Sequence, residues 1–120
     1  MKLDREDLTS GDCDENIEVP ALRLKDFLSS KLDLLKLEIN GCKTDVLLDC
    51  DEALQNVNNV FVLYRSSPRE PQAVDLVTRI LKDAGFRLHI YGEQKSPRPF
   101  LWRRVGSGTD MTLKIFAFRA

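Results

Sequence analysis

The stretch "DLLKLEINGCKTDVLLDC", residues 33–50, carries two hydrophobic periodicities that are separated by one glycine. Residues 34–39 form a short apolar run, which is typical of an interior strand of a parallel sheet. Gly41 permits a tight turn, Thr44 is placed to cap a helix, and the apolar spacing as far as Val57 is helical. The stretch therefore predicts a strand, a tight turn and then a helix that Asn58-Asn59 ends.

The same alternation continues toward the C-terminus. A second apolar run is rich in β-formers, and the helix after it has Pro71 in its first turn and Gly85 at its end. No helical pattern separates the last two apolar runs, so we expect them to pair as an antiparallel hairpin. The predicted strands are 34–39, 60–65, 86–92 and 111–118, with helices over 44–57 and about 71–84 and a loop over 93–110.

The N-terminal part of the chain differs in composition from the rest. Residues 1–16 are rich in Asp and Glu and predict a solvated acidic lead-in. "IEVPALRL", residues 17–24, contains Pro20 and suits an edge strand or an extended connection. We therefore expect one α/β domain over residues 17–120, with the helices as crossovers between parallel strands.

Composition excludes several classes of protein. The 120 residues carry a net charge of −1, which gives no general reason to expect nucleic acid or an anionic membrane as partner. No apolar run is long enough for a membrane span. Cys13, Cys42 and Cys50 are odd in number and lack CxxC spacing, which favours reduced thiols in a cytoplasm over a disulfide framework or a zinc site. We expect Cys42 and Cys50 to be small core residues. The single histidine, His89, excludes a histidine-based metal cluster.

Several segments, taken in order, resemble the FkbM family of methyltransferases. They are "VPALRLKDFL" (19–28), "DLLKLEINGCKTDVL" (33–47), "LKDAGFRL" (81–88), "SPRPF" (96–100) and "LKIFAFR" (113–119). The resemblance implies a class I, Rossmann-like fold: a three-layer α/β sandwich whose sheet is mostly parallel with an antiparallel C-terminal hairpin. It also implies methyl transfer from S-adenosylmethionine to a hydroxyl.

The resemblance covers only the C-terminal half of such a domain. In the family a glycine-rich turn after the first strand holds the cofactor, and no such turn exists here. We therefore assign no cofactor-binding residue and expect this chain alone not to bind S-adenosylmethionine. On this interpretation the chain is a truncated methyltransferase that is active only when a partner or a missing N-terminal half completes it. The alternative is a non-catalytic oligomeric binding module built on the half-fold.

Polar residues at the end of the first strand are the candidate catalytic group. Ligands bind beyond the carboxyl ends of strands in parallel sheets, and Glu38 and Asn40 occur there. The resemblance matches Glu38 to the first of three family acids, whereas Asn40 and Lys43 replace the other two. Glu38 could orient a hydroxyl or act as a base beside Asn40, or both could be solvated polar groups. A metal nuclease using Asp33 and Glu38 is disfavoured, because it requires a lysine where Asn40 stands.

A basic loop forms the second candidate site. It carries Arg98, Arg103 and Arg104 among aromatic residues, and we interpret it as a substrate or phosphate loop. The alternative is a surface loop whose aromatics, Phe100 and Trp102, anchor it to the core. Binding of single-stranded nucleic acid is less favoured, because such domains usually have a strongly basic balance.

The strand edge at residues 34–39 is the expected partner surface. The family places its first strand beside this one, so the half-domain would expose an apolar edge, which is a template for another chain. We expect a homodimer or a protein partner at this edge. Alternatively, the chain's own segment 17–24 covers it.

Overall fold

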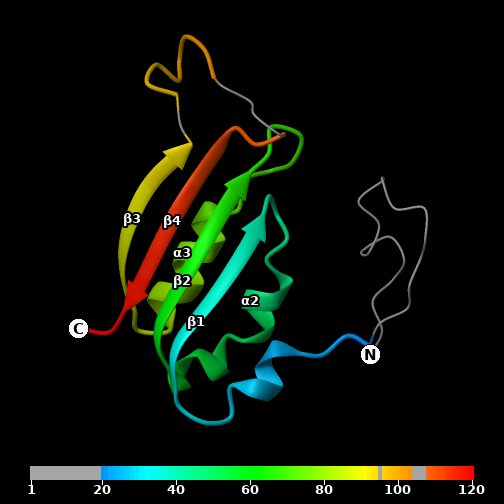
Figure 1. The fold of residues 1–120 in the computed structure, drawn as a ribbon, viewed down its shortest axis with the longest axis vertical. Helices are drawn as coiled ribbons and strands as arrows, with labels where there is room; N and C mark the ends of the chain where they lie inside the picture. The colour runs from blue at the N-terminus through cyan, green and yellow to red at the C-terminus, as the bar shows by residue number, and fades with distance from the viewer. Residues whose placement is uncertain (1–19, 95, 104–107) are drawn as a thin grey trace.

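The computed structural model describes residues 20–94, 96–103 and 108–120 (Figure 1). The predicted lead-in at 1–16 and the start of the 17–24 segment lie outside the described residues. The elements are the 3-10 helix η1 Leu24–Phe27, strand β1 Leu32–Asn40, helix α2 Asp45–Asp49, the 3-10 helix η2 Glu52–Asn56, strand β2 Val57–Ser66, helix α3 Val74–Asp83, and strands β3 Arg87–Gln94 and β4 Met111–Phe118.

The four strands form one mixed sheet in the order β1-β2-β4-β3 (Figure 1). β1 and β2 pair in parallel, and β4 runs antiparallel to both of its neighbours, β2 and β3. The predicted parallel pair and the antiparallel pairing of the last two strands are therefore confirmed. β4 is inserted between β2 and β3 in the sheet, so that the strand order differs from the chain order.

Helices α2 and α3 cover one face of the sheet, and they contact one another. Their buried side chains share one core with the strand residues that alternate onto this face. The described residues therefore form two layers, and the three-layer sandwich is not confirmed. The core includes Leu35 and Ile39 of β1, Val60, Val62 and Tyr64 of β2, Ile115 and Ala117 of β4, Leu47 of α2, and Val77 and Leu81 of α3.

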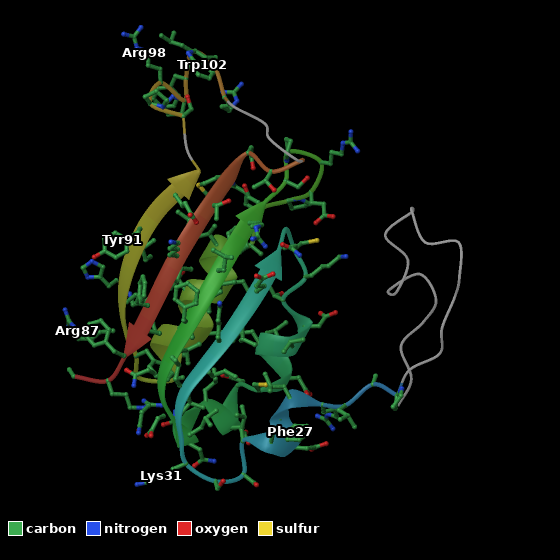
Figure 2. All side chains as sticks on the ribbon, in the orientation of Figure 1. Phe27, Lys31, Arg87, Tyr91, Arg98 and Trp102 are labelled. Carbon is green, nitrogen blue, oxygen red and sulfur yellow. The ribbon has the colours of Figure 1, made fainter. Side chains whose placement is uncertain are left out.

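The opposite face of the sheet, here called the open face, carries aromatic side chains from three strands. The Phe61 and Phe116 rings lie 5.0 Å apart between centroids, and Tyr91 lies 5.7 Å from Phe116. Tyr91 is 55% exposed and Phe116 39%. Figure 2 shows this face toward the viewer, with Tyr91 and Arg87 projecting from β3. Within the described part of the chain, no helix covers these rings.

The segment after β1 differs from the predicted helix over 44–57. The structure has two short helices, α2 and η2, and β2 already begins at Val57. Asn58 and Asn59 do not end a helix but lie in β2, where their side-chain amides donate to Asp33 of β1. Asn58 donates to the Asp33 Oδ1 at 3.1 Å, and Asn59 donates to the Asp33 carbonyl at 3.0 Å. The helical spacing nevertheless identified most of the buried residues: Leu47, Cys50, Leu54 and Val57 are fully buried, whereas Val46 is 51% exposed.

The end of α3 agrees with the prediction, whereas its start does not, because the helix begins at Val74 and Pro71 lies before it. Gly85 follows the helix with φ +92°, a conformation that side-chain-bearing residues rarely adopt. Its N–H donates to the Lys82 carbonyl at 2.9 Å, and the Phe86 N–H donates to the Leu81 carbonyl at 3.1 Å. This closing geometry satisfies the last carbonyls of the helix and turns the chain into β3.

Of the two forms expected for the 17–24 segment, the described part is a connection and not an edge strand. Residues 21–23 are irregular, and η1 follows them. Arg23 instead binds Asp49 of α2, with Nε 3.1 Å from Oδ2, and this hydrogen bond lowers the pKa of the Asp49 carboxyl. Within the described residues, no helix is long and apolar enough to cross a bilayer.

Candidate functional site

The carboxyl end of β2 and the amino end of β4 meet at one edge of the sheet. Ser66 is the last residue of β2, and its register partner Met111 is the first residue of β4. Because β4 is antiparallel, its start lies where the parallel strands end. Asp110, which precedes β4, therefore lies at the edge where α/β sheets bind ligands.

Ser66 and Asp110 are joined by two hydrogen bonds. The Ser66 hydroxyl donates to Asp110 Oδ1, and the Asp110 N–H donates to the Ser66 carbonyl at 3.2 Å. Gln72 Nε2 donates to Ser66 Oγ at 3.4 Å, and Ser66 is only 1% exposed. The serine proton points at a carboxylate oxygen, because a carboxylate only accepts. Ser66 therefore orients the Asp110 carboxylate and is not placed as a nucleophile.

A cavity of about 260 Å³, here called the strand-end cavity, opens beside this pair. The loop over it is held by its own hydrogen bonds: Arg103 Nη1 donates to the Pro99 carbonyl at 2.6 Å, and Ser96 Oγ donates to the Trp102 carbonyl at 2.6 Å. A carboxylate and a guanidinium thus line the same small space. The lining residues are Gln72, Ser96, Pro99, Arg103, Asp110 and Met111.

A buried tyrosine fixes the turn after β1 against the start of α3. The Tyr64 hydroxyl donates to the Gly41 carbonyl at 2.7 Å and accepts from the Ala73 N–H at 2.8 Å. Burial raises the pKa of Tyr64, so the phenol is neutral at physiological pH. Gly41 has φ +59°, and a Cβ there would meet Glu70 Oε2 at 1.9 Å. The space beside this turn is thus filled by the chain itself.

The predicted residues Glu38 and Asn40 lie elsewhere. Both are exposed, and both belong to the set of β1 residues that alternates onto the open face, opposite the buried Ile39. Glu38 Oε2 accepts from Arg65 Nη1 at 3.2 Å. Neither residue lines the strand-end cavity. Their catalytic role stays a prediction.

The basic loop contributes one of its predicted residues to the strand-end cavity. Arg103 lines the cavity, whereas Arg98 does not and is exposed near the tip of the loop with Trp102 (Figure 2). Arg104 lies outside the described residues. The alternative interpretation, in which aromatics anchor the loop to the core, is wrong for Phe100, which is 98% exposed.

Sequence reasoning missed Ser66, Gln72 and Asp110. Ser66 and Asp110 are 44 positions apart in the sequence and form no local motif. The available signal was positional: Asp110 directly precedes the one strand that we expected to run antiparallel. A residue in that position lies at the same edge as the ends of the parallel strands.

Of the two described cysteines, which were both predicted to lie in the core, only one does. Cys50 is buried, as expected, but Cys42 is exposed after the Gly41 turn. Burial raises the pKa of the Cys50 thiol, which further lowers its thiolate fraction.

We expect iodoacetamide to label Cys42 rapidly in the folded chain and Cys50 only after unfolding in urea. The thiolate is the reactive form, and a buried thiol is both inaccessible and protonated. Peptide mass spectrometry of the labelled chain reads each site separately. Equal labelling rates for Cys42 and Cys50 under native conditions would contradict the burial described here.

The fold and its site define a small α/β protein with a four-stranded mixed sheet. Neither a family model nor a curated protein matches the sequence. Among solved structures, the DNA methyltransferase M1.HpyAVI is similar at 19% identity and a TM-score of 0.43. The alignment covers 79% of this chain and 51% of that chain, so this chain spans about half the length of its structural neighbour.

Proposed function

We propose that this chain is the C-terminal half of an FkbM-like, S-adenosylmethionine-dependent methyltransferase domain. Completed by a glycine-rich half, it would transfer a methyl group to a hydroxyl. The observation that carries the proposal is the sheet itself: two parallel strands joined through a helix, closed by a helix-free antiparallel pair. Three of the five segments that resemble the family, 33–47, 81–88 and 113–119, fall on β1, on the end of α3 and on β4.

The turn at Gly41 does not fit S-adenosylmethionine. A cofactor turn needs backbone N–H groups that are open to the ligand. At Gly41, the glycine at the end of β1, the Glu70 carboxylate occupies the space a ligand would need, and Glu70 Oε2 lies 3.4 Å from the Cys42 N–H. We therefore derive no step of methyl transfer for the chain alone.

Calorimetry tests this proposal directly. Titration of S-adenosylmethionine into the chain is expected to give no saturable heat up to a concentration of about 1 mM, which equals the Kd of a very weak complex. Micromolar binding by the wild-type chain would show that the cofactor site is present and would refute the half-domain proposal.

We further propose that a protein partner or a second copy of the chain pairs with β1 over residues 34–39. β1 is an edge strand of the described sheet, and Leu34 on the open face is 60% exposed. Sheets with parallel strands are usually covered on both faces, and apolar edges attract other strands. A clean monomer in sedimentation at micromolar concentration, with the amides of residues 34–39 protected from hydrogen exchange, would count against this proposal.

A non-catalytic oligomeric binding module is the second candidate function. The exposed rings of Tyr91, Phe116 and Phe118 on the open face favour it, because apolar patches of this kind mark interaction surfaces. Binding of a partner on this face without any S-adenosylmethionine binding in the resulting complex would select this candidate over the enzyme.

A further inference from the structure

We propose that the strand-end cavity binds a small hydroxylated carboxylic acid. Arg103 would bind the carboxylate of the ligand, and Asp110 would accept a hydrogen bond from its hydroxyl. That such a ligand is also the methyl acceptor rests on the proposed function, but its binding does not. The proposal follows from three features of the cavity: a fixed acceptor, a forked cationic donor and a small volume.

The fixed acceptor is the Asp110 carboxylate. The buried Ser66 hydroxyl donates to Oδ1, and Gln72 in turn donates to that hydroxyl. These contacts set the orientation of the carboxylate before any ligand arrives, which reduces the entropy cost of binding. Oδ2 of the same carboxylate remains as an acceptor for a ligand hydroxyl, since an ionised carboxylate has several lone-pair sites.

The forked donor is the Arg103 guanidinium. Its Nη1 donates to the Pro99 carbonyl, which holds the side chain against its own loop. A guanidinium has five N–H donors, so the others can bind a ligand carboxylate in a bidentate geometry. Arg103 and Asp110 both line the cavity, yet no ion pair joins them among the described residues. The Arg103 guanidinium is therefore available to a ligand carboxylate, and the Asp110 carboxylate is available to a ligand hydroxyl.

The volume limits the size of the ligand. The cavity of about 260 Å³ is smaller than the pockets that hold drug-sized molecules, which suits a compound of a few carbons. Pro99 and Met111 provide apolar wall for a short carbon chain. A hydroxylated acid satisfies both polar groups at once, whereas a plain acid leaves Asp110 facing an apolar group.

Nuclear magnetic resonance of the ¹⁵N-labelled chain tests the proposal with three probes: glycerate, propionate and glycerol. Glycerate is expected to shift the amide signals of Gln72, Asp110 and Met111 in a saturable way. Propionate lacks the hydroxyls and is expected to bind at least about tenfold more weakly, the worth of a hydrogen bond to a charged group. Glycerol lacks the carboxylate and is expected to bind equally poorly.

Two matched variants locate the binding. Arg103→Met is expected to abolish the glycerate shifts, whereas Arg98→Met, in the same loop but outside the cavity, keeps them. Thermal melts confirm that both variants fold. No saturable shift with glycerate, equal affinity for glycerate and propionate, or the same loss in both variants would overturn the proposal. Because no S-adenosylmethionine is present, this outcome is independent of the methyltransferase test.

Discussion

Replacing Arg119 with methionine is expected to lower the free energy of unfolding by about 3–5 kcal/mol. Each hydrogen bond from a charged donor contributes about 1.5–3 kcal/mol, and the total is reduced because the freed carbonyls partly rehydrate. Arg119 donates to the carbonyls of Val57 at 3.1 Å, Ala84 at 2.8 Å and Leu54 at 2.7 Å. Its guanidinium also lies 4.1 Å from the centroid of the Phe86 ring. The Arg119 side chain, which follows β4, thus joins η2, the start of β2 and the end of α3 through hydrogen bonds.

Urea unfolding followed by circular dichroism measures this effect. Arg119→Lys keeps the charge but cannot reach three carbonyls with a planar fork, so we expect it to lose more than half of the same stability. Arg79→Met, on the exposed side of α3, is the matched control and should stay within about 0.5 kcal/mol of wild type. A loss below about 1 kcal/mol for Arg119→Met would mean that the three contacts contribute little.

Tyr64→Phe is expected to cost about 2–4 kcal/mol, because it leaves two buried backbone groups without a partner, each worth about 1–3 kcal/mol. The phenol is fully buried and bridges the Gly41 carbonyl and the Ala73 N–H. The change removes one oxygen and no apolar surface. The loss therefore reports hydrogen bonding and not packing.

Hydrogen exchange adds a local readout to the unfolding measurement for Tyr64→Phe. The Ala73 amide should exchange faster in the variant, since its acceptor is gone. Tyr91→Phe is the control: Tyr91 is 55% exposed, and its change should alter stability by less than about 0.5 kcal/mol. Unchanged Ala73 exchange in Tyr64→Phe would contradict the role assigned to the phenol.

Local signals in the sequence predicted much of the fold. β4 has the predicted bounds of 111–118, and Gly85 ends α3, because an apolar run and a glycine cap are local features. The prediction of one helix over 44–57 was wrong because tertiary contacts decide the structure there. Its apolar spacing also fits two short helices in series, and Asn58 and Asn59 find partners on β1 that no local pattern reveals.

The candidate site was less predictable from the sequence than the fold was. Arg103 was identified because cations among aromatics indicate an anion-binding loop, and it lines the cavity. Asp110 and Ser66 come together only because β4 enters the sheet beside β2, a pairing that the sequence left open. Glu38 could have been placed on the open face from alternation alone, since Leu35, Leu37 and Ile39 form the apolar side of β1.

The position of β4 between β2 and β3 is the claim on which the site depends. Cross-strand nuclear Overhauser contacts test it most directly. The structure predicts contacts of Ile115 with both Val62 and Ile90. It predicts none between Val62 and Ile90, because two steps of about 4.8 Å separate strands that are not neighbours. Direct contact between Val62 and Ile90, with Ile115 next to Ile90 alone, would place β4 at the edge of the sheet, remove Asp110 from Ser66 and contradict this account.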